Sequence, residues 1–327
     1  MMNRWKALRY LILLILLIIF VYTFYPHIGD FKSLYQIRDS LNYIWIIIGI
    51  LSQASQYLDD GYFTRKILKI LHFNIKLSDT IQVAAVDVFA THLFPIGQFG
   101  PLASNLYFYR KLGLDTQAVV FFNIVMSIVG VAVLIALFLF SSITIPNKTF
   151  PFPVHIYLLT TLFILFMLFL GILFLAFKVV KIQKNLEKFL KKFKWFISFK
   201  ENFAHLRRYR EFLSEKRGKF FAFAVTKSLL YYLADILTLL TCFLAFHTFP
   251  SISLVIFAYI LSQVAGAITL IPAGIGSTDI TLGVIFLSTG IPSGIVVGVI
   301  ILYRLLSFVL PIPLGAASYY SLKNKLK

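Results

Sequence analysis

LFPIGQFGP (residues 93–101) and LIPAGIGS (residues 270–277) each interrupt a long apolar stretch of this chain near its middle, the first within 81–113 and the second within 254–290. Pro and Gly end or kink helices, so neither stretch is predicted to form one continuous helix. Backbone that is not helical is tolerated at the depth of a membrane only where protein or a wet cavity surrounds it. In a membrane protein, both breaks are therefore expected in the interior.

The rest of the chain has the composition of a membrane protein. Of its 327 residues, 59% are hydrophobic and 13% are charged, which excludes a soluble enzyme. A helix that crosses the hydrocarbon of a bilayer needs about 20 mainly apolar residues. Runs of about this length are found at 8–25, 41–58, 116–143, 156–178, 220–246 and 293–321. The sequence therefore predicts an all-α polytopic fold with about six full transmembrane helices.

The charges predict how these helices are oriented. Most of the 31 Lys and Arg residues lie in the amino terminus, 59–80, 101–115, 178–219 and the carboxyl-terminal tail. Cytoplasmic loops carry the excess of Lys and Arg, so we expect a plasma-membrane protein with both termini and the long basic loop in the cytoplasm. This alternation requires 81–113 and 254–290 to return to the side from which they entered. Both are thus predicted to be re-entrant helical hairpins, the first entering from the cytoplasm and the second from outside.

The basic loop, residues 179–219, carries aromatic residues among its cations. In its first half Ile182, Leu186 and Phe193 belong to an apolar stripe at helical spacing, which is typical of an amphipathic helix on anionic lipid headgroups. The same charges would equally serve as a topology anchor, and both interpretations stay open. No recognition motif accompanies them, so no nucleic-acid partner is expected.

The two interrupted stretches resemble each other. With a constant offset of 177 residues, Pro95 aligns with Pro272, Gly97 with Gly274, and Gly113 with Gly290. Together with the opposite entry sides, this indicates an inverted-topology repeat, an arrangement that is typical of transporters. Within a single membrane domain, 1–327, the halves of the repeat are predicted at about 81–143 and 254–321.

Each break creates a helix that starts at membrane depth. Such an amino-terminal end presents unpaired N–H groups and partial positive charge, which suit a phosphate or a carboxylate. A capped, closed helix start without a ligand is the alternative. The candidate substrate-binding residues are Pro95, Gly97, Gly100, Pro101, Pro272, Gly274, Gly276, Ser277, Thr278, Asp279, Tyr303 and Arg304.

Ionisable side chains inside the apolar stretches are costly unless they face the interior. Arg304 is the best candidate to hold a lipid phosphate with two hydrogen bonds, or else to pair with Asp279 or Asp235. Asp87, Asp235 and Asp279 are candidates to carry protons or ions. Lys227 is expected to extend its ammonium to the cytoplasmic surface.

Evidence for an enzyme is weak. Asp59 and Asp60, at the cytoplasmic end of span 41–58, would suit Mg²⁺ on a phosphorylated lipid or sugar donor. A solvated loop start explains them better, because no further acidic or His cluster supports a metal site. The lone Cys242 excludes a cysteine metal site and an intramolecular disulfide. The chain shows no GxSxG, P-loop, HExxH or EF-hand motif, so we expect no metal and no cofactor.

The break residues resemble a known family. PAGIGSTD (272–279), Gly290 and the Tyr303-Arg304 pair are similar to motifs of the lysylphosphatidylglycerol synthase transmembrane region family, whose first motif reads Pro-Gly-Gly-Ile-Gly-x-x-Glu. FPIGQFGPLASNLYFYRKLG (94–113) is similar to the Pro-x-x-x-Gly-Gly-x-Pro stretch of its stand-alone members. This family is the flippase-like domain at the amino-terminal end of the bacterial multiple peptide resistance factor.

The chain also departs from the family pattern. Ala273 replaces a Gly, Asp279 replaces the usual Glu, and Gln98-Phe99 separates the glycines of the first motif. The chain ends at Lys327 without a soluble acyltransferase-like domain, so aminoacyl-lipid synthesis is expected to be absent. The resemblance implies the lipid-translocating half alone.

These observations favour a lipid flippase that moves or binds an anionic or phosphate-bearing phospholipid between leaflets. One alternative is a membrane-embedded lipid-linked glycosyl- or phosphoryl-transferase that uses Asp59 and Asp60, since the family is sometimes grouped with such enzymes. Another is a membrane scaffold that recruits partners through the basic loop. The sequence leaves the identity of the lipid and any homo-oligomer open.

Overall fold

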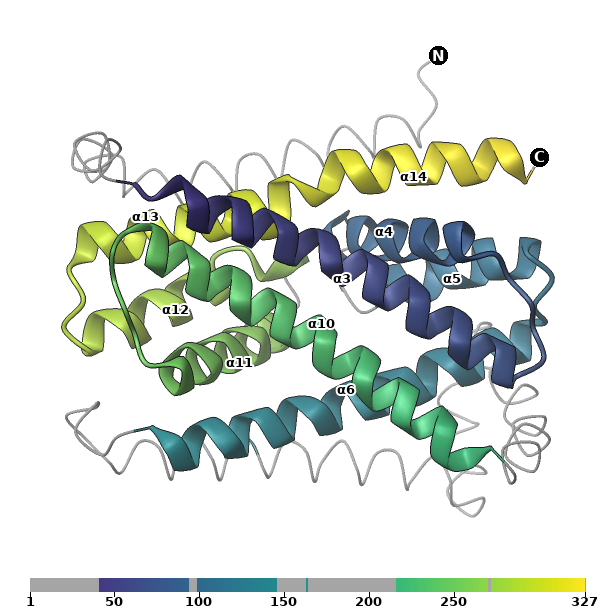
Figure 1. Ribbon diagram of the computed structural model, residues 1–327, viewed down its shortest axis with the longest axis horizontal. Coiled ribbons are helices and arrows are strands. Elements are labelled where there is room, and N and C mark those ends of the chain that lie inside the picture. The colour runs from purple at the N-terminus through teal and green to yellow at the C-terminus, as the bar shows by residue number, and fades with distance from the viewer. Residues whose placement is uncertain (1–40, 94–98, 146–162, 164–215, 270–271, 327) are drawn as a thin grey trace, which may run out of the picture.

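The computed structural model describes residues 41–93, 99–145, 163, 216–269 and 272–326, which are helical apart from turns and short connections and contain no strand (Figure 1). The elements are α3 (Tyr43–Ile70), α4 (Leu77–Leu93), α5 (Phe99–Lys111), α6 (Thr116–Thr144), α10 (Arg217–Ala245), α11 (Ile252–Thr269), the 3₁₀ turn η3 (Pro272–Gly274), α12 (Ser277–Ser288), α13 (Ser293–Arg304), the π-helical turn η4 (Leu305–Val309) and α14 (Pro311–Lys325). The all-α class predicted from the sequence is confirmed.

In the described part of the chain, three helices are long and apolar enough to cross a membrane: Thr116–Thr144, Arg217–Ala245 and the continuous run Ser293–Lys325. They coincide with predicted spans 116–143, 220–246 and 293–321. The predicted spans 8–25 and 156–178, except for Phe163, and most of the basic loop lie outside the described residues.

One expectation about α3 was wrong. Residues 59–70 were expected to form a loop after span 41–58, but they continue the helix to Ile70. Asp59, Asp60 and Arg65 lower the mean hydropathy here, but two of them have partners in the fold: Asp60 pairs with Lys227 of α10, and Arg65 donates to the carbonyl of Ile75.

Helices α3 and α10 lie side by side and antiparallel through the centre of the molecule (Figure 1). Hydrogen bonds join the two helices: Ser52 Oγ donates to the carbonyl of Ala234 at 2.8 Å, and Gln56 Nε2 donates to the carbonyl of Tyr231 at 3.1 Å. Such bonds hold helices together where both are surrounded by apolar groups.

Two helical hairpins, α4–α5 and α11–α12, approach the centre from opposite ends of the molecule (Figure 1). The tip of the first hairpin is tight, since a Cβ on Gly100 would lie 2.5 Å from the carbonyl oxygen of Ala90. The tips meet, because α4 contacts η3. The hairpins predicted from the Pro/Gly breaks are therefore present, whereas their re-entry into a membrane stays a prediction.

The order of one helix, a hairpin and a long helix occurs twice. The first copy consists of α3, α4–α5 and α6, and the second of α10, α11–α12 and the run from α13 to α14. The turn after each hairpin contains a glycine with left-handed backbone, Gly113 at φ 99° and Gly290 at φ 83°, where a side chain would be strained. These are the glycines that the offset of 177 residues aligned.

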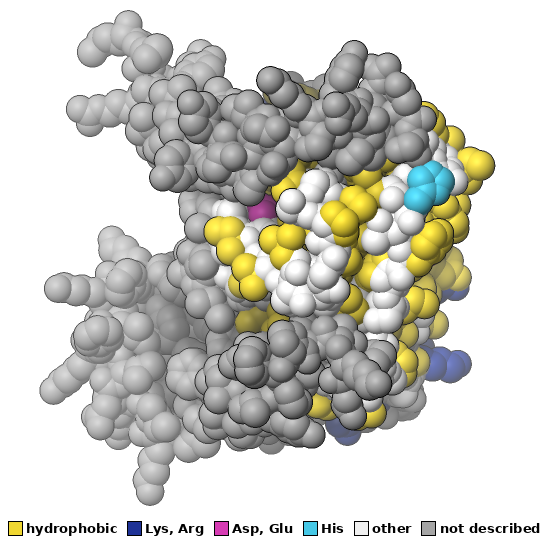
Figure 2. Space-filling view, turned by 90° about the vertical axis from the view of Figure 1, so that its left-hand side faces the viewer, with side chains coloured by type: hydrophobic (Ala, Val, Ile, Leu, Met, Phe, Trp, Pro, Cys, Tyr) yellow, Lys and Arg dark blue, Asp and Glu magenta, His cyan; other side chains and the backbone are white. Residues whose placement is uncertain are grey.

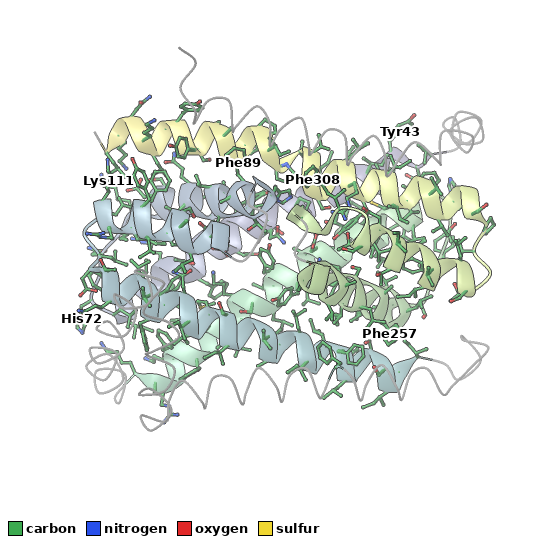
Figure 3. All side chains as sticks on the ribbon, turned by 180° about the vertical axis from the view of Figure 1, so that it is seen from behind. Tyr43, His72, Phe89, Lys111, Phe257 and Phe308 are labelled. Carbon is green, nitrogen blue, oxygen red and sulfur yellow. The ribbon has the colours of Figure 1, made fainter. Side chains whose placement is uncertain are left out.

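The two ends of the molecule differ in charge. The end where α3 stops, α5 turns into α6, α10 starts and α14 stops holds all Lys and Arg of the described residues except Lys227 and Arg304; we call it the cationic end (Figure 1). Its cations are Arg65, Lys66, Lys69, Lys76, Arg110, Lys111, Lys216, Arg217, Lys219, Lys323 and Lys325. In Figure 3, Lys111 and His72 mark this end, and Tyr43 and Phe257 mark the other. Among its described residues, the opposite end shows mainly hydrophobic and uncharged atoms, with one His side chain and one small acidic area visible (Figure 2).

The apolar core is divided into two clusters. One contains Ile67, Phe108 and Phe220, and the other contains Leu239, Phe257 and Phe286. The polar side chains between these clusters build the candidate site.

Candidate functional site

A polar cavity of about 200 Å³ lies where the hairpin tips meet the antiparallel pair α3 and α10. It is lined by Gln53, Gln56, Val88, Thr91, His92, Tyr231, Asp235, Gln263, Gly266, Ala267, Ala273, Gly274, Thr278, Tyr303, Arg304 and Ser307. Most of these side chains form hydrogen bonds, which is unusual for the interior of so apolar a protein. Polar groups inside an apolar helical bundle are costly and are typical of functional sites in membrane proteins.

The second break has an irregular backbone. Ala273 at φ 53°, Gly274 at φ 62° and Gly276 at φ 88° are all left-handed, which turns the chain between α11 and α12. The carboxylate of Asp279 then caps α12, accepting a hydrogen bond from the N–H of Gly276 at 2.9 Å. Asp279 therefore satisfies a backbone donor at this helix start.

Arg304, the last residue of α13, closes the second break. Its Nε lies 2.6 Å from Asp279 Oδ1, and its Nη1 donates to the carbonyl of Ala273 at 3.2 Å. Nη2 donates to the hydroxyl of Thr278 and, at 3.5 Å, to the carbonyl of Gly274. The side chains of Arg304 and Asp279 are only 12% and 9% exposed. Arg304 was expected to pair with Asp279 or Asp235 if it did not hold a phosphate, and in the structure it pairs with Asp279.

This pairing has a chemical consequence for the site. The amino terminus of a helix together with a guanidinium is a favourable place for an anion. In this conformation the carboxylate of Asp279 occupies that place, so the positive charge of Arg304 is compensated within the protein.

Asp235 of α10 lies on the opposite side of the cavity. It accepts hydrogen bonds from Gln53 Nε2 at 2.9 Å and from the Tyr303 hydroxyl at 3.1 Å. Across the described ranges it forms no ion pair with Lys, Arg or His. The hydrogen-bond donors of Asp235 are therefore neutral, while Arg304 acts on it electrostatically without forming an ion pair.

His92 joins the first hairpin to the last long helix. Its Nδ1 is 2.6 Å from the carbonyl oxygen of Val88, and its Nε2 is 3.1 Å from the carbonyl oxygen of Ser307. The ring also stacks on Phe308, with centroids 4.7 Å apart. Phe308 and Phe89 lie between the two ends of the molecule in Figure 3.

The structure brings together some of the sequence-predicted residues and not others. Gly274, Thr278, Tyr303, Arg304 and Asp235 line the cavity. Pro272 belongs to η3. The start of α12 is formed by Gly276, Ser277 and Asp279, which are not among the described residues that line the cavity.

The first hairpin contributes less to the cavity. Pro95 and Gly97 lie outside the described residues. Gly100 and Pro101 form the first turn of α5, and Ser104 of that helix donates a hydrogen bond to Asp87 of α4. Asp87 thus faces α5 rather than the cavity.

The sequence interpretation missed the glutamines. Gln53, Gln56 and Gln263 all line the cavity. Each is an amide inside an apolar stretch, and this signal could have found them.

Two expectations about charged residues near the cationic end were wrong. Asp59 and Asp60 are not a solvated loop start, because both lie inside α3. Lys227 does not extend to the surface: its Nζ lies 3.0 Å from Asp60 Oδ2, and these side chains are 13% and 21% exposed. In the described residues, no three His, Cys, Asp or Glu side chains gather closely enough to hold a metal ion.

Comparison with known proteins places the chain in a family. The sequence model of the lysylphosphatidylglycerol synthase TM region matches residues 7–315. The chain belongs to this family. The match includes both hairpins and Arg304, so the residues that build the cavity lie within the family region.

Two archaeal relatives are similar to this member of the lysylphosphatidylglycerol synthase TM region family. A UPF0104 membrane protein of Methanocaldococcus jannaschii is 22% identical, over 99% of this chain and 98% of its own length. A UPF0104 membrane protein of Methanothermobacter thermautotrophicus is 32% identical over 89 residues, 27% of each chain. Both names describe a membrane protein, which agrees with the apolar helices of the fold.

Proposed function

We propose that this protein is a lipid flippase, which binds the polar headgroup of a phosphate-bearing phospholipid in the central cavity and moves the lipid between leaflets. The observation that carries the proposal is a polar cavity of about 200 Å³ at the meeting point of two helical hairpins from opposite ends of an apolar bundle. Membership of the lysylphosphatidylglycerol synthase TM region family supports it.

The architecture supports alternating access. The two copies of helix, hairpin and long helix run in opposite directions, as in transporters built from inverted repeats around a midplane site. In our proposal the hairpins are re-entrant, and rocking of one copy against the other opens the cavity to each side in turn.

The ion pair at the second break provides the means of capture. A lipid phosphate would replace the Asp279 carboxylate beside Arg304 at the start of α12, and Asp279 would return when the lipid leaves. Asp279 thereby acts as an internal competitor that prevents the headgroup from being held permanently. Asp235, with Asp87 as a second candidate, would couple movement to protons or ions.

The charge asymmetry supports a plasma-membrane protein with its cationic end in the cytoplasm. There the basic loop, 179–219, would contact anionic headgroups.

The proposal is tested by measuring the movement of headgroup-labelled phospholipids between leaflets of proteoliposomes, with several headgroups. We expect the unmodified protein to accelerate movement of at least one phosphate-bearing lipid. Arg304→Ala should abolish both binding and movement. Asp279→Asn should retain binding but slow movement, because the competitor is lost.

The matched control is Arg110→Ala, which removes an exposed cation far from the cavity and should behave like the unmodified protein. If the folded protein moves none of the lipids, even under an imposed proton gradient, the flippase proposal is overturned.

A further inference from the structure

The antiparallel helices α3 and α10 share a repeated motif, and only one of its two copies contributes its Asp to the cavity. Tyr57-Leu-Asp-Asp60 of α3 and Tyr232-Leu-Ala-Asp235 of α10 share the pattern Tyr-Leu-x-Asp with an offset of 175 residues. Their helices occupy corresponding places in the two copies of the fold. Asp60 is therefore the counterpart of Asp235.

The surroundings of the two carboxylates differ in one respect. Across the contact between α3 and α10, Asp60 faces Lys227, with Nζ and Oδ2 3.0 Å apart. The residue that corresponds to Lys227 in the other copy is Ser52, whose hydroxyl donates to the carbonyl of Ala234 instead. A cation closes the Asp60 side, whereas the side with Asp235 opens into the cavity.

The region around Asp60 holds more buried polar groups than an ion pair requires. Asp87 of α4 is within electrostatic reach of Asp60 and Lys227, and Ser104 of α5 donates to it. One buried atom nearby has no hydrogen-bond partner among the described residues: Oδ1 of Asn105, which follows Ser104 in α5 and is only 3% exposed as a residue. An unpartnered buried group is costly, which points to a ligand that satisfies it in another conformation.

We propose that Asp60, Asp87 and Lys227 form a second half-site for the transported headgroup, closed in this conformation and related by the repeat to the open cavity at Asp235. The inference rests on the proposed flippase function. Lys227 would bind the phosphate of a headgroup, and the two carboxylates would accept hydrogen bonds from its hydroxyl groups. The ion pair of Lys227 with Asp60 keeps this half-site shut from the cationic end until a headgroup separates its partners.

Thiol labelling tests the proposal independently of lipid movement. Ala224 of α10 is fully buried, one turn from Lys227 toward the cationic end, and Ala267 lines the open cavity. Each is changed to Cys in a Cys242→Ala protein, reconstituted in vesicles of phosphatidylglycerol and phosphatidylcholine, and exposed to a membrane-impermeant thiol reagent from one side at a time.

Lys227→Met should make Ala224→Cys react about tenfold faster from the cationic end, a change of about 1.4 kcal/mol in the opening equilibrium. Ala267→Cys should react more slowly from the opposite end, because the two sides open in turn. Exchanging the charges, Asp60→Lys with Lys227→Asp, should restore protection of Ala224→Cys.

Lys219→Met, which removes an exposed cation of the same helix, is the matched control and should change neither rate. The half-site is refuted if Ala224→Cys stays protected in folded Lys227→Met protein, or if both reporters become reactive together, which indicates loosening rather than alternation. If labelling alternates as expected while no lipid moves, the half-site stands as a gate and the flippase function fails.

Discussion

At the scale of single residues, the ion pair of Arg304 with Asp279 decides how the second break is held. Both side chains are almost fully buried, and Asp279 also caps α12. A buried ion pair recovers its desolvation cost only when further hydrogen bonds satisfy both partners. Here the carbonyl of Ala273 and the hydroxyl of Thr278 supply them. The pair therefore positions the break, and it is also the group that an anionic ligand has to displace.

Removing one partner of this pair should be more damaging than removing both. Arg304→Met leaves Asp279 buried and unpaired, which costs roughly 3–5 kcal/mol. Adding Asp279→Asn should recover part of this loss, because the amide oxygen still accepts from Gly276 while the buried charge disappears. Thermal unfolding in detergent measures both variants, with Lys219→Met as a neutral control. A double variant that loses the sum of the two single losses would contradict this account.

At the scale of elements, the hairpins were predictable and the length of α3 was not. The Pro/Gly breaks locate the tips of α4–α5 and α11–α12 because those residues act locally on the backbone. The second half of α3 was misread as a loop because hydropathy averages over side chains without knowing their partners. Asp60 is neutralised by Lys227, a residue far away in sequence, and no local pattern contains that pairing.

The first hairpin depends on a close approach at Gly100. Gly100→Ala would place a methyl group 2.5 Å from the carbonyl oxygen of Ala90, a backbone atom that cannot move aside. We expect a loss of roughly 1–3 kcal/mol, as for other overpacked positions. Gly218→Ala is the matched control: it lies in α10 with nothing within 4 Å of the added Cβ, so stability should be unchanged or slightly higher. Denaturation in detergent compares the two, and equal stabilities would show that the tip is looser than described.

At the scale of the whole molecule, the site combines residues that the sequence indicated with residues that only the fold brings together. Arg304 and Asp279 were found because charges are rare in apolar helices, and Gly274 and Thr278 because they belong to the break. Gln53 reaches Asp235, 182 positions away in sequence, only because α3 and α10 pack side by side. The cavity is thus a consequence of topology. Local sequence patterns predict some of its residues, but they do not predict that these residues lie close together.

The same topology fixes where the two ends of the molecule should lie. Helix α10 has 29 residues, and at 1.5 Å per residue it is about 43 Å long, more than the roughly 30 Å of hydrocarbon in a bilayer. Its ends should therefore emerge on opposite sides, with the cationic end in the cytoplasm. In a Cys242→Ala protein, Phe249→Cys, at an exposed position beyond α10, should react with an impermeant thiol reagent on intact cells. Lys69→Cys at the cationic end should react only after permeabilisation. Labelling of both from outside would refute a spanning α10, and the reverse pattern would invert the orientation and with it the side on which the Asp60 half-site opens.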